Sequence, residues 1–106
     1  MGKIKELLTN RELLLEIGLN PRNLGFRYWE LAIELYELNT RNFKIYKIMN
    51  IYKEIADIYK TSFMAVEKAM RESVNNDKEK ISKWLLDNYK FNGKITNKTL
   101  LTYIIR

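Results

Sequence analysis

The chain has 106 residues, which is long enough for one domain with a single hydrophobic core and too short for two. It is 46% hydrophobic and 30% charged, a composition typical of a folded globule and not of a disordered chain. Cysteine and histidine are absent, so disulfides, thiolate chemistry and most hydrolase arrangements are excluded. The net charge of +6 favours an anionic partner, either nucleic acid or a membrane surface.

The first predicted helix covers residues 3–17, where apolar side chains recur at helical spacing. Thr9 and Glu12 form a T-x-x-E capping box within it, so we expect one bent helix or two abutting helices. Gly18 suits the left-handed position that ends a helix. Charged residues interrupt every apolar run here, which excludes a signal peptide and a spanning helix. We therefore expect a soluble, cytoplasmic protein without a membrane partner.

The second predicted helix is the main scaffold of the fold. Asn20 followed by Pro21 is expected to cap and open it, and it should end at about Glu37. Its core face carries four apolar side chains at helical spacing: Phe26, Trp29, Ile33 and Tyr36. Its other face carries three carboxylates, Glu30, Glu34 and Glu37. They form either a solvated acidic stripe or a divalent-cation site, and the absence of histidine favours the stripe.

A turn is predicted at residues 39–42, which read NTRN, before a third apolar helix over about 43–51. The stretch from Tyr52 to Val74 then has the pattern of a helix-turn-helix. The core faces of its two helices are predicted to hold Ile55, Ala56 and Tyr59, and then Val66, Ala69 and Met70. The tight turn between them is residues 60–62, in which either Thr61 or Ser62 caps the second helix.

The outer side of that second helix is predicted to carry six residues: Phe63, Met64, Glu67, Lys68, Arg71 and Glu72. Four of them are charged, and base edges in the major groove are read by carboxylate, amine and guanidinium groups. This surface is either a DNA-recognition face or a solvated helix face. The basic net charge favours DNA.

The C-terminal part is predicted to form two more helices. Asn76 with Glu79 is expected to cap the first, which carries Ile81, Trp84 and Leu85. Residues 90–96 form a loop around Gly93, and the last helix begins at about Asn97. Its apolar side chains, Leu100, Leu101, Ile104 and Ile105, either fold back on the scaffold helix or form a contact between protomers.

Three lysines, Lys90, Lys94 and Lys98, surround that loop and helix start. Their ammonium groups and the helix amides can together hold a phosphate, although loop lysines also serve solubility alone.

Three blocks of the chain resemble a known family: residues 16–35 (EIGLNPRNLGFRYWELAIEL), 54–74 (EIADIYKTSFMAVEKAMRESV) and 94–104 (KITNKTLLTYI). They are similar to the C-terminal DNA-binding domain of the master sporulation response regulator of spore-forming Firmicutes. The resemblance implies one all-α domain over residues 1–106, a compact bundle of about six helices. It also implies binding to TGTCGAA-type boxes, commonly as tandem copies, and regulation of sporulation genes through RNA polymerase.

The family's recognition helix carries the pattern V-E-R-x-I-R-H, which reads V-E-K-A-M-R-E at residues 66–72 within a recognition helix of about 63–74. By this resemblance Glu67 and Lys68 read bases. Phosphate contacts are expected from Arg71, Lys94, Ser62 and Lys98. Lys68 replaces an arginine that makes a planar bidentate contact, and Glu72 replaces a histidine and brings a carboxylate near phosphate. We therefore predict an altered or weaker box preference.

The family's receiver domain has no counterpart in these 106 residues, so we expect an excised domain or a stand-alone paralogue, and the start at Met1 favours the paralogue. The leading hypothesis is a sequence-specific transcriptional regulator that binds double-stranded DNA, with RNA polymerase as a further partner and tandem or homodimeric binding. The alternative is an interaction module or antagonist that pairs with full-length relatives without binding DNA. No enzyme activity, catalytic residue, cofactor or metal is expected.

Overall fold

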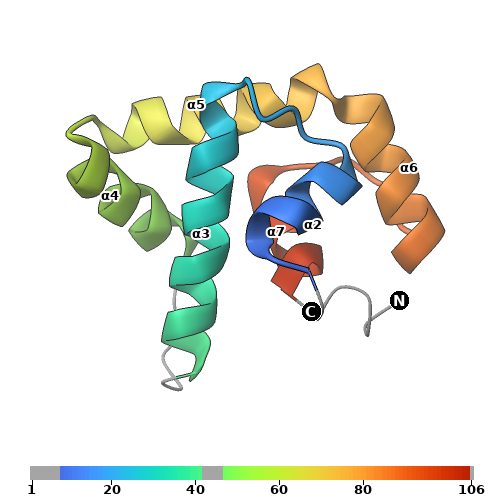
Figure 1. Ribbon diagram of the computed structural model, residues 1–106, viewed down its shortest axis with the longest axis horizontal. Helices are drawn as coiled ribbons and strands as arrows, with labels where there is room; N and C mark the ends of the chain where they lie inside the picture. Colours follow the sequence, from blue (N-terminus) through green and yellow to red (C-terminus); the bar gives the residue numbers. More distant parts are fainter. Residues whose placement is uncertain (1–7, 42–46, 106) are drawn as a thin grey trace.

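The structure, a computed structural model, describes residues 8–41 and 47–105. Within these ranges the chain forms six α-helices and no strand, which confirms the predicted all-α fold. The helices are α2 (Asn10–Ile17), α3 (Leu24–Arg41), α4 (Ile48–Tyr59), α5 (Phe63–Asn76), α6 (Lys78–Tyr89) and α7 (Asn97–Ile105). In Figure 1, α5 crosses one end of the upright α3, with α4 on one side of α3 and α2, α6 and α7 on the other.

The predicted capping box begins α2. Thr9 Oγ1 accepts a hydrogen bond from the Glu12 amide at 3.1 Å, and Glu12 Oε1 accepts one from the Thr9 amide at 3.1 Å. The bond that the Thr9 amide donates to the carboxylate favours its ionised form and therefore lowers the pKa of Glu12. Gly18 ends the helix with φ 117°, the left-handed conformation predicted for it. The predicted helical residues 3–7 lie outside the described residues.

The prediction that Asn20 and Pro21 open the scaffold helix is wrong, because α3 begins at Leu24. Asn20 Oδ1 accepts a hydrogen bond from the Arg22 amide at 2.9 Å and so closes a local turn instead. The Asn20 amide donates to Asp77 Oδ2 at 3.0 Å, which joins this turn to the junction of α5 and α6.

The predicted cap of α6 by Asn76 and Glu79 is also wrong. Asn76 is the last residue of α5, and Asp77 stands at the N-cap position of α6. The Asp77 carboxylate accepts from the Asn20 amide and makes no side-chain capping bond to α6. Asp77 therefore makes a tertiary hydrogen bond with Asn20 in place of a local capping bond to α6.

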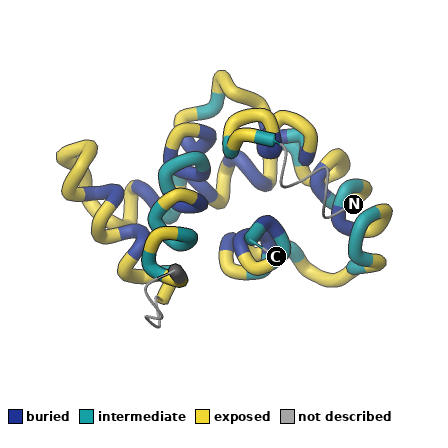
Figure 2. Tube along the Cα trace, turned by 60° about the horizontal axis from the view of Figure 1, so that its bottom comes forward, coloured by how far each residue is buried: buried dark blue, intermediate teal, exposed yellow. Residues whose placement is uncertain are grey.

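The centre of the core is the seam between α3 and α5. Trp29 is fully buried, and its Nε1 donates to the Met70 carbonyl oxygen at 3.2 Å and to Ser73 Oγ at 3.1 Å. The largest core side chain thus has its polar atom satisfied, as burial requires. Gly25 lets the two helices approach closely, because a Cβ atom there would overlap the Ala69 carbonyl oxygen. Figure 2 shows the buried residues along the inner sides of the helices.

The helix α3 runs to Arg41, beyond the predicted end at Glu37, so the predicted turn at residues 39–42 is helical over 39–41. The side chains of Asn39 and Thr40 donate to the carbonyl oxygens four residues earlier, at 2.8 and 2.7 Å. Such back-bonding lets residues that favour turns stay within a helix. Residues 42–46, including the first four residues of the predicted third helix, lie outside the described residues, and the rest of that prediction corresponds to the start of α4 at Ile48.

The last helix folds back on the scaffold. Within α7, Leu100, Leu101 and Ile104 are buried, and the helix packs against α3 and α5. The apolar end is therefore covered within the chain, which resolves the two alternatives left open by the sequence.

Candidate nucleic-acid interface

The predicted helix-turn-helix corresponds to α4, a three-residue turn and α5. Lys60 ends α4 with φ 57°, a left-handed conformation that is uncommon outside glycine. Ser62 and not Thr61 caps α5, since Ser62 Oγ accepts from the Ala65 amide at 3.1 Å. The turn therefore has a defined geometry in which α5 begins abruptly at Phe63.

One side of this helix pair faces the core as predicted. Ile55 and Ala56 of α4 are buried, as are Val66 and Met70 of α5, and Ala69 is partly buried. Tyr59 differs from the prediction because it is 38% exposed. Its ring packs edge to face on Tyr28, with the centroids 5.2 Å apart, at the rim of the core and not inside it.

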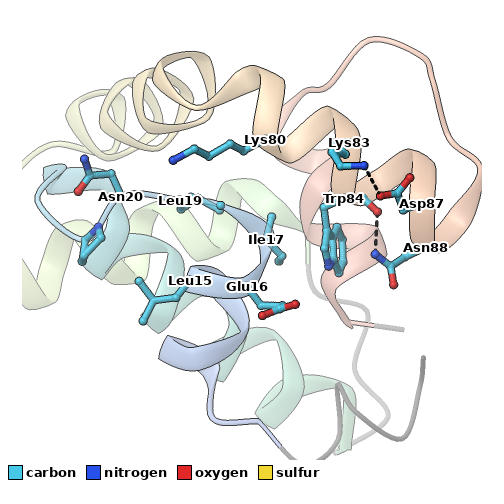
Figure 3. Close-up of a pocket in the computed structure, with 12 residues that line it drawn as sticks. Leu15, Glu16, Ile17, Leu19, Asn20, Lys80, Lys83, Trp84, Asp87 and Asn88 are labelled. Atoms are coloured by element: carbon cyan, nitrogen blue, oxygen red, sulfur yellow. Dashed lines mark hydrogen bonds and ion pairs between the residues drawn. The ribbon is translucent and has the colours of Figure 1, made fainter.

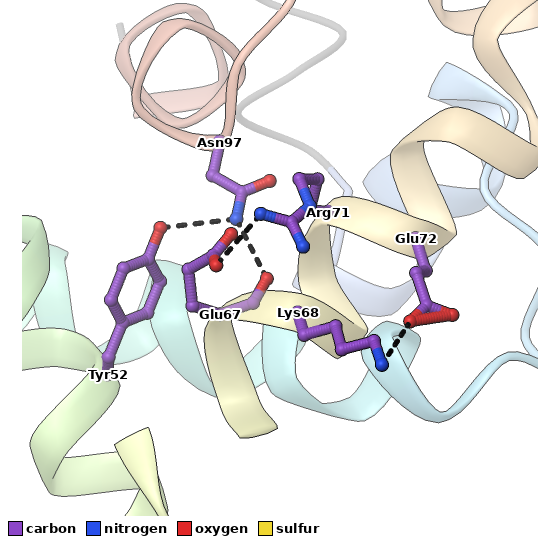
Figure 4. Close-up of polar contacts among 6 residues, drawn as sticks. All are labelled: Tyr52, Glu67, Lys68, Arg71, Glu72 and Asn97. Carbon is purple, nitrogen blue, oxygen red and sulfur yellow. Dashed lines mark hydrogen bonds and ion pairs between the residues drawn. The ribbon is translucent and has the colours of Figure 1, made fainter. Parts of the chain in front are cut away.

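The outer side of α5 carries two ion pairs, drawn in Figure 4. Arg71 Nη1 lies 3.1 Å from Glu67 Oε1, and Lys68 Nζ lies 3.9 Å from Glu72 Oε1. Lys68, Arg71 and Glu72 are exposed, as predicted, while Glu67 is half-buried. Exposed pairs at this spacing contribute only about 0.3–0.5 kcal/mol each, so a ligand can separate them at little cost.

Asn97 joins α7 to both helices of the pair. Its Nδ2 donates to Tyr52 Oη at 3.1 Å and to the Glu67 carbonyl oxygen at 3.3 Å (Figure 4). Asn97 and Tyr52 are buried, and burial raises the pKa of the Tyr52 phenol because it disfavours the phenolate. Sequence reasoning missed this pair, since an asparagine at a helix start is ordinarily explained as a local cap.

The predicted phosphate-contacting residues lie at two places around α5. Ser62 lies at its N-terminus, and its hydroxyl proton is not used in the capping bond, so it can donate to a ligand. Lys94 and Lys98 are exposed residues of the chain around Asn97, which the Glu67 hydrogen bond holds against α5. Asn97 itself therefore lies against α5, with Lys98 directly after it and Lys94 three residues before it in the chain.

The acidic stripe on α3 forms no metal site in the described part of the chain, where no cluster of three metal-ligating side chains occurs. Glu30 instead accepts from Arg11 Nη1 at 3.3 Å. Across residues 8–41 and 47–105, no helix is long and apolar enough to cross a bilayer.

A hollow of about 660 Å³ lies between the end of α2 and α6 (Figure 3). Its charged lining residues balance, with Glu16 and Asp87 against Lys80 and Lys83, and Lys83 Nζ lies 3.0 Å from Asp87 Oδ2. No residue of α5 lines it, so it is separate from the face that carries Glu67.

The sequence model of one protein family, described as "Sporulation initiation factor Spo0A C terminal", matches residues 10–106 of the chain. The matched range includes every described helix, and with it the α4–α5 pair and the segment around Asn97. Comparison with curated proteins and with solved structures gave no match.

Proposed function

Because this chain belongs to the family of sporulation initiation factor Spo0A C-terminal domains, which are DNA-binding regulators and not enzymes, we propose that it reads a TGTCGAA-type box. In this proposal residues 52–74 act as the helix-turn-helix, and α5 lies in the major groove. The main support for this proposal is the outer side of α5, where charged side chains project from a helix that Met70 and Val66 hold in the core. Rigid support of this kind is what base readout requires.

Base reading falls to Glu67 and Lys68. The Glu67 carboxylate can accept from a cytosine amine, and the Lys68 ammonium can donate to guanine O6 or N7. Lys68 must first leave Glu72, which is inexpensive because the pair is long, at 3.9 Å, and exposed. Glu67 keeps its orientation through Arg71 Nη1 at 3.1 Å.

Phosphate contacts fall to Arg71, Ser62, Lys94 and Lys98. A guanidinium has five N–H donors, so Arg71 can hold Glu67 and still donate to a phosphate. Ser62, at the start of α5, contacts the DNA backbone there. Lys94 and Lys98 contact the DNA backbone from the segment that Asn97 anchors. Contacts at both places would fix the register of α5 in the groove.

The direct test is fluorescence anisotropy with a labelled duplex carrying the box and a scrambled duplex, at two salt concentrations. We expect preference for the box to persist at the higher salt, while the affinity for both duplexes falls, since phosphate contacts release counterions. Equal affinity for both duplexes at each salt concentration would refute base reading.

The proposal includes action in the cytoplasm, where bacterial DNA lies, tandem or dimeric binding, and contact with RNA polymerase. Cross-linking on duplexes with one or two boxes would test the pairing of protomers. Transcription in vitro with purified RNA polymerase would test the contact with the polymerase. Unchanged transcript levels at saturating concentrations of this protein would refute that contact.

One observation favours the second candidate function, an interaction module that pairs with full-length relatives without binding DNA. The two ion pairs on α5 neutralise its outer side, since Glu67 and Glu72 offset Arg71 and Lys68. Co-purification with a full-length relative, together with no binding to any duplex, would support this function over DNA reading. A protein that always purifies alone would exclude it.

A further inference from the structure

Met64 is the most exposed of the large hydrophobic side chains in the described part of the chain, at 66%. It lies in the first turn of α5 and precedes Glu67, Lys68 and Arg71 by three, four and seven residues. Residues at these spacings share one face of a helix. The apolar thioether therefore belongs to the same surface as the proposed base-reading pair.

We propose that Met64 is a third base-reading residue, whose thioether packs against the C5-methyl group of a thymine beside the bases read by Glu67 and Lys68. This inference rests on the proposed function. A helix-turn-helix places the N-terminal residues of its second helix at the base edges, and Met64 is the second residue of α5. The thymine methyl is the apolar group that the major-groove edge presents.

Met64 has no structural role that would explain its side chain. The core side of α5 is filled by Val66, Met70 and Val74, and Met64 is neither buried in the described core nor packed against it. An unbranched thioether adapts readily to an apolar group placed against it. Exposure of this side chain in the isolated protein thus leaves it available for a ligand.

The surroundings of Met64 favour a polyanion over an apolar protein surface. The exposed Lys60 stands four residues before Met64, in the turn that leads into α5. Lys68 lies one helical turn beyond Met64. Lys60 and Lys68 therefore stand on either side of Met64 in the chain, and Lys68 can leave its long, exposed pair with Glu72 at 3.9 Å. Such an arrangement suits DNA, whose phosphates flank the methyl groups in the groove.

The experiment replaces each thymine of the box in turn by deoxyuridine, which removes only the methyl group. Affinities are measured by anisotropy for the wild type and for Met64→Ala, with Met49→Ala as the matched control. Met49 is the same residue type, 43% exposed, in the first turn of α4. For the wild type we expect one deoxyuridine to weaken binding about fourfold, the value of burying one methyl group.

Met64→Ala should lose that sensitivity and bind the thymine and deoxyuridine duplexes equally, whereas Met49→Ala should behave as the wild type. Box preference without any deoxyuridine effect in the wild type overturns this inference and leaves the proposed function standing. An effect of the same size in Met64→Ala also overturns it, because another group then reads the methyl. Absence of box preference on the unmodified duplex overturns both.

Discussion

The close approach of α3 to α5 predicts that Gly25→Ala destabilises the domain, although alanine is the better helix former by about 1 kcal/mol. The added methyl group would overlap the Ala69 carbonyl oxygen and lie 2.8 Å from Ser73 Oγ. Backbone cannot move aside as a side chain can, so α5 must shift away from α3. Overpacking of this kind costs about 1–3 kcal/mol.

The shift also lengthens the two hydrogen bonds of Trp29 Nε1, to the Met70 carbonyl oxygen at 3.2 Å and Ser73 Oγ at 3.1 Å. Weakening them removes about 1 kcal/mol. After subtraction of the helix-propensity gain, the free energy of unfolding should fall by about 2 kcal/mol. For a domain of this size the melting temperature should then fall by about 10 °C.

Urea and thermal denaturation followed by circular dichroism would measure both quantities, with Gly93→Ala as the control. The three atoms nearest a methyl group at Gly93 all belong to the Phe91 side chain, the closest at 3.0 Å, so this ring need shift by only a few tenths of an ångström. The control should therefore stay within about 0.5 kcal/mol of the wild type. A Gly25→Ala protein that melts at or above the wild-type temperature would show that the α3–α5 seam has room for a methyl group at this position.

Four further substitutions test the interface. Lys68→Ala should reduce discrimination between the box and a scrambled duplex, while Lys94→Ala should weaken both about equally; identical behaviour in anisotropy would contradict this division of roles. Glu72→Gln removes a carboxylate near phosphate and releases Lys68, so it should raise affinity for both duplexes several-fold, and unchanged affinity would place Glu72 away from the DNA. Asn97→Ala removes the hydrogen bonds to Tyr52 Oη and the Glu67 carbonyl oxygen. It should therefore lower the free energy of unfolding, measured by urea denaturation, by about 1 kcal/mol. The control Asn92→Ala, at an exposed residue, should keep the wild-type free energy of unfolding. Equal stability of these two variants would contradict the anchoring role.

Features that depend on a few neighbouring residues were predictable from the sequence. The capping box of Thr9 and Glu12 and the left-handed Gly18 each involve partners within four residues, so a short motif suffices to identify them. The apolar faces of α3 and α5 were predictable for the same reason, because helical spacing alone brings Trp29 and Met70 inward.

Features that depend on distant residues were not predictable. Asn20 bonds through its amide to Asp77, 57 residues away, and this bond removes the expected cap of α6. Asn97 bonds to Glu67 across 30 residues, and nothing local distinguishes it from an ordinary helix-capping residue. That bond fixes the start of α7 against α5, so the contact between these two helices at Asn97 could not be predicted from the sequence.

The two sides of α5 separate the residues that fold the domain from those proposed to read DNA, and this separation bears on how a box preference could evolve. Packing rests on Val66, Met70, Ser73 and Val74, whereas the outward residues Met64, Lys68 and Glu72 contribute little to the core. Substitutions at the outward positions can therefore accumulate without unfolding the protein. Under the proposed function, a domain built in this way can shift toward a new operator while its scaffold stays constant.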